Sequence, residues 1–343
     1  MAEFVRAAVL TGYVLTMKSL GADPLPLLRE VGLSEKLLSN PEQSISRKTA
    51  MRLVERAVEV TGCATFGLRM AECRGLANLG AVSLLIAHAN NLRDAIAALN
   101  RYRNQVNEKL VLRVIDVSDG LLIQQDLVAG EVKRSNQFYD LALGVLMKLC
   151  TEMLGEEWYP KLAYLMHQPP PLAEIATYRR VFRCSPEFNA VCNGLVIDYS
   201  DFERRSRRAD TALADHARKL VESLDLPERQ SVIQQVEHST LLLMPSGRAT
   251  IETCSSLLGM SVRTLQRALE AEGASFSRLI GRQREQLSGE YLANPHISIT
   301  DVAAMLGYSS ISAFSRWHMQ TFGISAMARR KSAKAINSAR SSD

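Results

Sequence analysis

The run Leu258-Gly259-Met260-Ser261 recurs later in the chain as Leu306-Gly307-Tyr308-Ser309. Each run stands between two short stretches with the apolar spacing of a helix, and the second helix of each pair is predicted at about 262–272 and 310–321. Glycine supplies the positive φ that a tight turn needs, and a following serine caps the next helix. Because helices joined by such a turn cross steeply, the sequence predicts a duplicated helix-turn-helix.

The second helix of each copy has an inner and an outer face. Leu265 and Leu269 are predicted to face the core in the first copy, and Phe314 in the second. Outward side chains of such helices read base edges in duplex DNA, arginine at guanine and glutamine at adenine. The predicted base-reading residues are Arg263, Gln266, Arg267, Ser312, Ala313 and Arg316. The predicted backbone contacts are Ser261, Thr264, Arg282, Ser309 and Ser310.

One continuous helix is predicted between the two copies. It covers Phe276–Ala293 and would be about 27 Å long at 1.5 Å per residue. Together with the width of the flanking helices, this length suits the roughly 34 Å repeat of successive major grooves. Arginines on or near this helix, at 278, 282 and 284, are placed to touch phosphates between the grooves. One chain would then read an asymmetric site.

The charge distribution agrees with a nucleic-acid partner. The chain has 343 residues and a formal net charge of +5. Residues 240–343 hold 12 basic and 7 acidic residues, whereas the residues before them are balanced. A neutral large part joined to a basic smaller part is typical of a DNA-binding C-terminal domain. With 47% hydrophobic and 22% charged residues, the composition excludes a disordered chain. No membrane span or signal peptide is predicted, so we expect a cytoplasmic protein.

The residues before the duplicated motif predict an α+β domain. The first hundred residues have helical spacing, and the period then changes to that of strands at Leu110–Val117 and Gly120–Leu127, which form a hairpin signal. Further strands are predicted at Lys161–Met166, Phe188–Asn189 and Leu195–Tyr199, with helices at 138–154 and 174–182. This order suggests a small, mostly antiparallel sheet with helices on one face, followed by an all-α C-terminal domain.

Catalytic and metal-binding signatures are missing from the sequence. It contains no Gly-x-Ser-x-Gly, phosphate-cradling glycine loop or Rossmann fingerprint, and no HxxxH or CxxC pair. We therefore predict no enzyme activity, no metal and no cofactor. The six cysteines are expected to be buried free thiols, although Cys184 and Cys192 could instead form a redox pair. Two alternatives stay open: an architectural DNA-binding protein without an effector, and a DNA-modifying enzyme fused to the helix-turn-helix domain.

Two places are candidates for binding a small molecule. Arg101, Tyr102 and Arg103 end a helix beside the hairpin, where guanidinium groups could pair with an anionic effector. The other interpretation of this cluster is a basic helix end that complements the helix dipole. His167 follows a strand and precedes three prolines, so it could line a pocket.

The C-terminal third resembles the DNA-binding domain of the AraC/XylS family of transcription regulators. The residues that carry the resemblance are Leu258–Arg267, Ile299–Ala303, Gly307–Arg316 and Phe322–Ser325. The family usually has proline after that last serine, and this chain has Ala326, which leaves the start of the final helix less defined.

The preceding residues resemble the arabinose-binding-type sensor domain of one branch of that family. The matching stretches are Thr65–Met70, Leu79–Val82, Leu92–Tyr102, Val181–Asn189 and Asn193–Asp198. The resemblance implies an effector-responsive regulator, commonly an activator that contacts RNA polymerase, with a homodimer possible. It implies an effector-sensing or dimerisation domain at 1–205, a helical linker at 206–239, a double helix-turn-helix domain at 240–330 and a disordered basic tail at 331–343. The effector and the operator are not implied.

Overall fold

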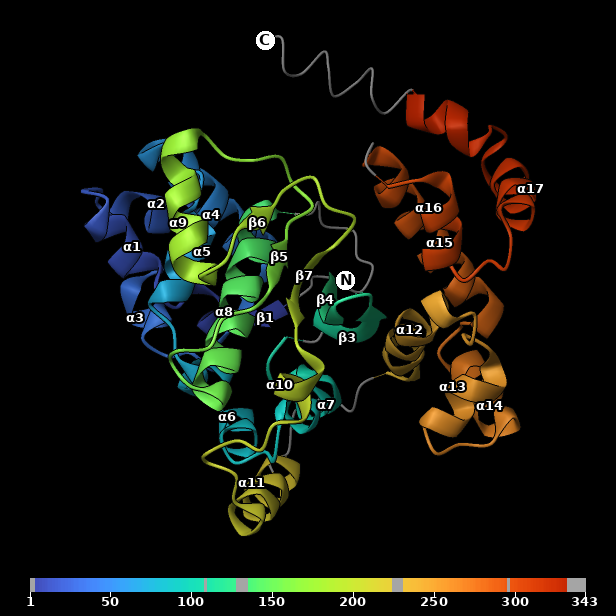
Figure 1. The fold of residues 1–343 in the computed structure, drawn as a ribbon, viewed down its shortest axis with the longest axis horizontal. Helices are drawn as coiled ribbons and strands as arrows, with labels where there is room; N and C mark the ends of the chain where they lie inside the picture. Colours follow the sequence, from blue (N-terminus) through green and yellow to red (C-terminus); the bar gives the residue numbers. More distant parts are fainter. Residues whose placement is uncertain (1–3, 108–109, 128–134, 224–230, 295–296, 332–343) are drawn as a thin grey trace. The chain divides into compact units, whose positions relative to one another are not determined.

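The structure is a computed structural model that describes residues 4–107, 110–127, 135–223, 231–294 and 297–331. It divides into two compact units (Figure 1). The first unit comprises residues 1–126, 131–188 and 192–226, and the second comprises 127–130, 189–191 and 227–343. The first contains helices and a small sheet and the second is helical, so the predicted fold class is confirmed. Most of the predicted tail, 332–343, lies outside the described residues.

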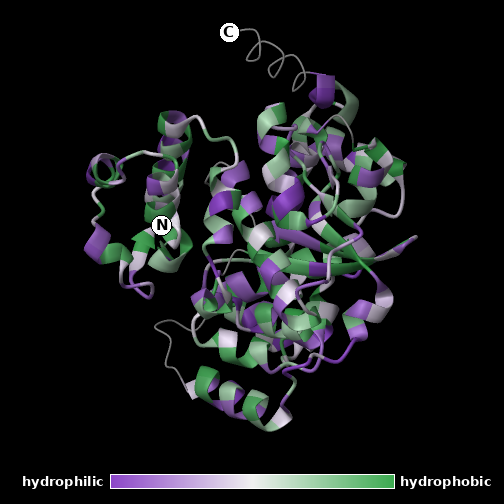
Figure 2. Ribbon diagram, turned by 60° about the vertical axis from the view of Figure 1, so that its left-hand side comes forward, coloured by the Kyte–Doolittle hydropathy of each residue, from purple (hydrophilic) through white to green (hydrophobic). Residues whose placement is uncertain are grey.

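Helices dominate the first hundred residues, as the spacing predicts. Their polar and apolar residues alternate along the chain (Figure 2). In α7, for example, Leu92 and Ile96 are buried while Arg93 is exposed. The α-helices of the first unit are α1 (Tyr13–Ser19), α2 (Leu25–Glu30), α3 (Glu35–Leu38), α4 (Arg47–Thr61), α5 (Phe66–Glu72), α6 (Val82–Ala87), α7 (Leu92–Arg101), α8 (Asn136–Leu154), α9 (Leu172–Phe182), α10 (Tyr199–Glu203) and α11 (Thr211–Ser223). Its 3-10 helices are η1 (Ala7–Leu10), η2 (Leu76–Leu79) and η3 (Arg103–Gln105).

The main sheet has five strands in the order β3-β4-β7-β5-β6. The strands are β3 (Leu110–Val117), β4 (Gly120–Leu127), β5 (Leu162–Tyr164), β6 (Pro186–Glu187) and β7 (Asn193–Ile197). β7 pairs antiparallel with β4, where Ile123 lies opposite Leu195, and antiparallel with β5. β5 and β6 run parallel. The sheet is therefore mostly antiparallel, as predicted.

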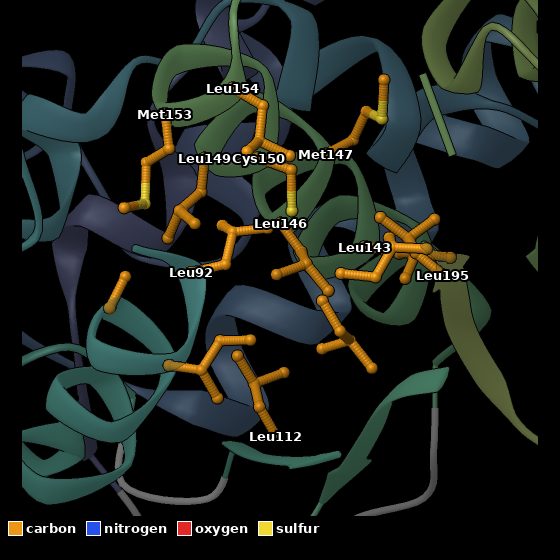
Figure 3. Packing of buried hydrophobic residues seen from close by; sticks show 14 of the residues in the cluster. Leu92, Leu112, Leu143, Leu146, Met147, Leu149, Cys150, Met153, Leu154 and Leu195 are labelled. Atoms are coloured by element: carbon orange, nitrogen blue, oxygen red, sulfur yellow. The ribbon is translucent and has the colours of Figure 1, made fainter. Parts of the chain in front are cut away.

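The core of the first unit gathers around α8, whose apolar residues continue around most of the helix. Leu143, Leu146 and Cys150 are buried among side chains of α7, β3 and β7 (Figure 3). Leu141, two residues before Leu143 on α8, belongs to a second cluster formed with α1, α4 and α5. One central helix thus joins the helical N-terminal part to the sheet.

The described part of the second unit contains six labelled α-helices and a further helical segment after them. The labelled helices are α12 (Val232–Leu243), α13 (Ile251–Leu257), α14 (Val262–Ala271), α15 (Phe276–Ala293), α16 (Ile299–Met305) and α17 (Ile311–Phe322), with the 3-10 helix η4 (Met244–Ser246) after α12. Residues 326–331 are also helical. Within this unit α13 and α14 lie at one end of α15, and α16 and α17 lie at the other (Figure 1). None of the described helices combines the length and hydropathy needed to cross a bilayer.

Several short features differ from the sequence prediction. Residues 4–6 and 44–46 form a two-stranded antiparallel sheet, β1 (Phe4–Arg6) with β2 (Ser44–Ser46), which three-residue runs are too short to predict. The strand predicted at Phe188–Asn189 lies two residues earlier, at β6, because Asn189 adopts a positive φ that ends the extended run.

The cysteines are free thiols, so Cys184 and Cys192 do not form a disulfide. Burial raises the pKa of the Cys150 and Cys192 thiols to about 12, so both stay protonated at neutral pH. The expectation that all six are buried is wrong for Cys73, which is exposed just after α5, and Cys184 is only half-buried.

Candidate nucleic-acid interface

The first helix-turn-helix is built by local hydrogen bonds. Thr250 caps α13 by accepting the N–H of Thr253 at 3.2 Å, and Ser261 caps α14 by accepting the N–H of Thr264 at 3.1 Å. The turn between them contains Gly259, whose φ is +66°. These caps satisfy amides that would otherwise lack a partner, and they fix where each helix begins.

The inner and outer faces of α14 lie as predicted. Leu265 and Leu269 are 0% and 1% exposed and pack with Cys254 of α13. Arg263, Gln266 and Arg267 are exposed on the other side. The first recognition helix therefore presents two guanidinium groups and one amide to solvent.

The second helix-turn-helix repeats this construction with one change. Ser298 caps α16 by accepting the N–H of Asp301 at 3.0 Å, and Gly307 at the turn has a φ of +75°. The cap of α17 is Ser310, which accepts the N–H of Ala313 at 3.2 Å. The sequence offers two adjacent serines, and the structure uses the later one, leaving Ser309 exposed before the helix.

Aromatic side chains support α17 where leucines support α14. Phe314 is 0% exposed and contacts Tyr308, Trp317 and His318, with ring centroids 5.7 to 5.9 Å away. Ser312 and Arg316 are exposed, and Ala313 is half-buried. Of its predicted base-reading side chains, the second recognition helix therefore presents one guanidinium group and one hydroxyl to solvent.

His318 is a buried histidine behind the second recognition helix. Its Nδ1 lies 2.8 Å from the carbonyl oxygen of Ile324, and the ring is 0% exposed. Burial, together with the nearby charge of Arg329, lowers the pKa of His318, although the Ile324 carbonyl acts in the opposite direction. At neutral pH the ring is therefore neutral and donates its Nδ1–H to that carbonyl.

The arginines of α15 divide into two kinds. Arg278 and Arg282 are exposed, as a phosphate contact requires. Arg284 is half-buried, donates to the carbonyl oxygen of Leu306 at 3.1 Å, and lies 4.8 Å from the centre of the Tyr308 ring. It therefore holds the end of α16, and its contact with phosphate stays a prediction.

The end of the domain has a defined helix despite Ala326. Ser325 accepts the N–H of Ala328 at 3.1 Å, and Ala326 is buried at 4% exposure. A serine cap and an alanine, which is the best helix former, suffice where the resemblance leads one to expect proline.

The Arg101, Tyr102 and Arg103 cluster is engaged within the first unit. Tyr102 donates to Glu222 of α11 at 2.8 Å, and Arg101 pairs with the same carboxylate at 3.2 Å. Arg103 is buried and donates to the carbonyl oxygen of Asn100 at 3.1 Å. The cluster therefore ties the end of α7 to α11, and sequence spacing alone could not reveal Glu222 as its partner.

His167 belongs to a different, interior group. Its Nε2 lies 3.0 Å from Asp140 of α8, and the hydroxyl of Tyr178 donates to the same carboxylate at 2.5 Å. Burial lowers the pKa of His167, but the hydrogen bond and charge of Asp140 and the carbonyl of Gln168 outweigh it, so the pKa rises. Asp140 was not a sequence candidate, although a single acid in the apolar run of α8 was a usable signal. The four candidates thus lie in two separate groups.

Two families match this chain in comparisons of its sequence. Residues 21–206 match the arabinose-binding domain found at the N-terminus of AraC transcription regulators. Residues 254–332 match a helix-turn-helix domain. The first match covers more than half of the chain, and the second covers both recognition helices, α14 and α17.

Similar proteins are found over nearly the full length. The HTH-type transcriptional regulator VirS of Mycobacterium tuberculosis is 28% identical over 326 residues, covering 94% of this chain and 95% of VirS. The ornithine utilization regulator of Pseudomonas aeruginosa is 22% identical over 328 residues, covering 92% and 93%. Among solved structures, the transcriptional regulator CdpR of P. aeruginosa aligns with a TM-score of 0.40 and 18% identity, covering 90% of this chain and 96% of CdpR.

Proposed function

Because the chain belongs to the AraC family of transcription regulators, we propose that it recognises promoter DNA by inserting α14 and α17 into two successive major grooves. The observation that carries this proposal is the equivalence of the two motifs. Arg267 and Arg316 each lie six residues after the capping serine of their helix, and both are exposed. A bidentate arginine contact with guanine is a common way to read one base pair.

The remaining exposed residues fit supporting roles. Arg263, Gln266 and Ser312 lie beside the two arginines and would read further base edges, with the half-buried Ala313 able to meet only a close-lying group. The hydroxyls of Ser261, Ser309 and Ser310 stand at or before the helix starts, and that of Thr264 lies in the first turn of α14, where phosphate groups are favoured. Arg282 of α15 would contact the phosphates between the grooves. These contacts add affinity and fix the register.

The first unit is proposed to sense a small molecule or to form a homodimer. In this proposal residues 1–205 form the sensing part, residues 206–239 the linker and residues 240–330 the DNA-binding part. The match of 21–206 to an arabinose-binding domain supports a sensor, and the relatives are transcription regulators, which supports a role without catalysis. RNA polymerase is the proposed partner for activation, and the cytoplasm, where promoter DNA lies, is the proposed location.

Mapping of bound sites across the genome of the source organism tests this function. A sequence-specific regulator gives a few sharp sites upstream of genes, sharing one asymmetric motif with two halves. An architectural protein gives broad, weakly sequence-dependent occupancy. Occupancy of that second kind, with no shared motif, would overturn the proposal.

A further inference from the structure

The helix α12 and the 3-10 helix η4 that follows it form one continuous segment, which contacts the first motif through α12 and the second through η4. The helix α12 has 12 residues, a length of about 18 Å at the usual rise per residue. It packs against α13, α14 and α15. It is also the first helix described after residues 224–230, which connect it to the first unit. After the first unit, α12 therefore precedes both recognition helices in the chain.

The start of α12 is bound by the end of the first recognition helix. The carboxylate of Glu272, the residue that ends α14, accepts the backbone N–H of Val232 at 2.8 Å and that of Ile233 at 3.3 Å. A carboxylate at the start of a helix is stabilised by the helix dipole and by amides that lack an intrahelical partner. This contact joins the two helices through their ends.

Side-chain packing continues the connection between α12 and α14. Val236 of α12 is 0% exposed and lies in the same cluster as Leu265 and Leu269 on the inner face of α14. A shift of α12 would therefore change both the packing behind α14 and the hydrogen bonds at its end. Because packed side chains resist compression, α14 would follow.

The far end of α12 meets the second motif in another way. The carbonyl oxygen of Met244, which follows α12, lies against Gly307, where an added Cβ would stand 2.3 Å from it. This contact involves the turn before α17 and leaves the recognition helix itself untouched. Between the ends, Gln283 of α15 accepts the hydroxyl of Thr240 and donates to the carbonyl of Glu237, both at 2.6 Å.

We propose that Glu272 is a positioning residue that couples α14 to α12, so that the position of α12 adjusts the DNA contacts of the first motif and not those of the second. The proposal rests on the proposed function, because it assigns regulation to the same pair of recognition helices. In this proposal DNA binding is regulated through the first motif, because its recognition helix is joined to α12 by the side chain of Glu272.

The experiment uses the full chain and a duplex that the wild-type protein selects from a random-sequence pool. Loss of one half of the footprint in Arg267→Ala and of the other in Arg316→Ala assigns the halves to α14 and α17. The test variants are Glu272→Ala and Glu272→Gln, of which the second keeps one acceptor oxygen. The control is Glu270→Ala, an exposed glutamate near the end of the same helix.

The expected result is a loss confined to one half. Glu272→Ala weakens protection of the α14 half by about tenfold, a usual size for coupling between two elements. Protection of the α14 half in Glu272→Gln is intermediate between that in Glu272→Ala and that in the wild type. Protection of the α17 half is unchanged in both Glu272 variants. Glu270→Ala protects both halves as the wild type does.

Two results would overturn the proposal. One is a Glu272→Ala footprint equal to that of Glu270→Ala. The other is parallel weakening of both halves together with a lower melting temperature, which would make Glu272 a stability residue only. If the wild-type protein selects no sequence from the pool, the result contradicts sequence-specific DNA binding, which is the proposed function, and is thereby distinguished from a failure of the Glu272 proposal.

Discussion

The two helix-turn-helix motifs share their caps, their glycine turns and the place of one exposed arginine, but they are supported differently. The first recognition helix rests on two leucines and is joined to α12 through Glu272. The second rests on an aromatic cluster around Phe314, and its turn lies against the Met244 backbone. A repeated sequence motif therefore places one exposed arginine at the same position of each recognition helix but packs the two helices against different side chains, and the first motif is the one that α12 can adjust.

The largest expected difference concerns the two turn glycines. An alanine at Gly307 would place its Cβ 2.3 Å from the Met244 carbonyl oxygen, in addition to the strain of a positive φ. Gly307→Ala should therefore lower the free energy of unfolding by about 3 kcal/mol or more. Gly259→Ala meets open space and should cost about 1 kcal/mol, the strain alone. Calorimetric unfolding of both variants compares them, and equal losses would show that the close approach is unimportant.

The second difference is in DNA affinity. Arg267→Ala and Arg316→Ala should each weaken specific binding by about 1–3 kcal/mol, because each removes one bidentate base contact. Sequence preference should relax at one position in each half of the site. Binding measured on duplexes with single base changes checks this expectation. If either variant keeps wild-type preference at every position, that arginine does not read a base.

Acid should weaken the second motif selectively. The folded pKa of His318 lies below the unfolded value of about 6.5, so below that pH the unfolded state binds more protons. Stability contributed by the neutral ring is therefore present above this pH and is lost as the pH falls. Protection of the α17 half should decline on acidification while the α14 half persists. His318→Asn keeps a hydrogen-bond donor but does not titrate, so in this variant acid should no longer reduce protection of the α17 half more than that of the α14 half. If protection of the α17 half still declines as in the wild type, His318 is not the group that causes the decline.

The smallest effect is expected at Arg282. Arg282→Ala should weaken binding to all sequences equally and lower the slope of log affinity against log salt by about one. Its control is Arg284→Ala, which removes the contact with Leu306 and should act through stability of the second motif. A sequence-dependent loss in Arg282→Ala would contradict the phosphate assignment.

The features that the sequence predicts well are those formed by residues close together in the chain. The Leu-Gly-x-Ser runs, the inward Leu265 and Phe314, and the long helix between the motifs follow from spacing within a few turns, and the structure has them all. The choice of Ser310 over Ser309 as a cap depends on where the preceding turn ends, and adjacent serines look alike in a pattern. The two three-residue strands β1 and β2 pair across nearly forty residues of chain, beyond any periodic signal.

The sequence pattern could not predict contacts between side chains that are far apart in the chain. Glu272 looks like one more exposed acid at a helix end, and only the fold brings it to the first amides of α12. Arg284 resembles its neighbour Arg282 in sequence, yet one is half-buried against Tyr308 and the other is exposed. The candidate effector residues lie in two groups for the same reason. Tyr102 hydrogen-bonds to Glu222, and His167 hydrogen-bonds to Asp140 in a different part of the first unit.

Hydroxyl-radical footprinting of the wild-type protein on its selected duplex tests most directly whether α14 and α17 read adjacent major grooves. If both helices read the duplex, two protected patches appear on one face of it, about one helical turn of 10–10.5 base pairs apart. A single patch, or two patches on opposite faces, would contradict this arrangement of the two helices.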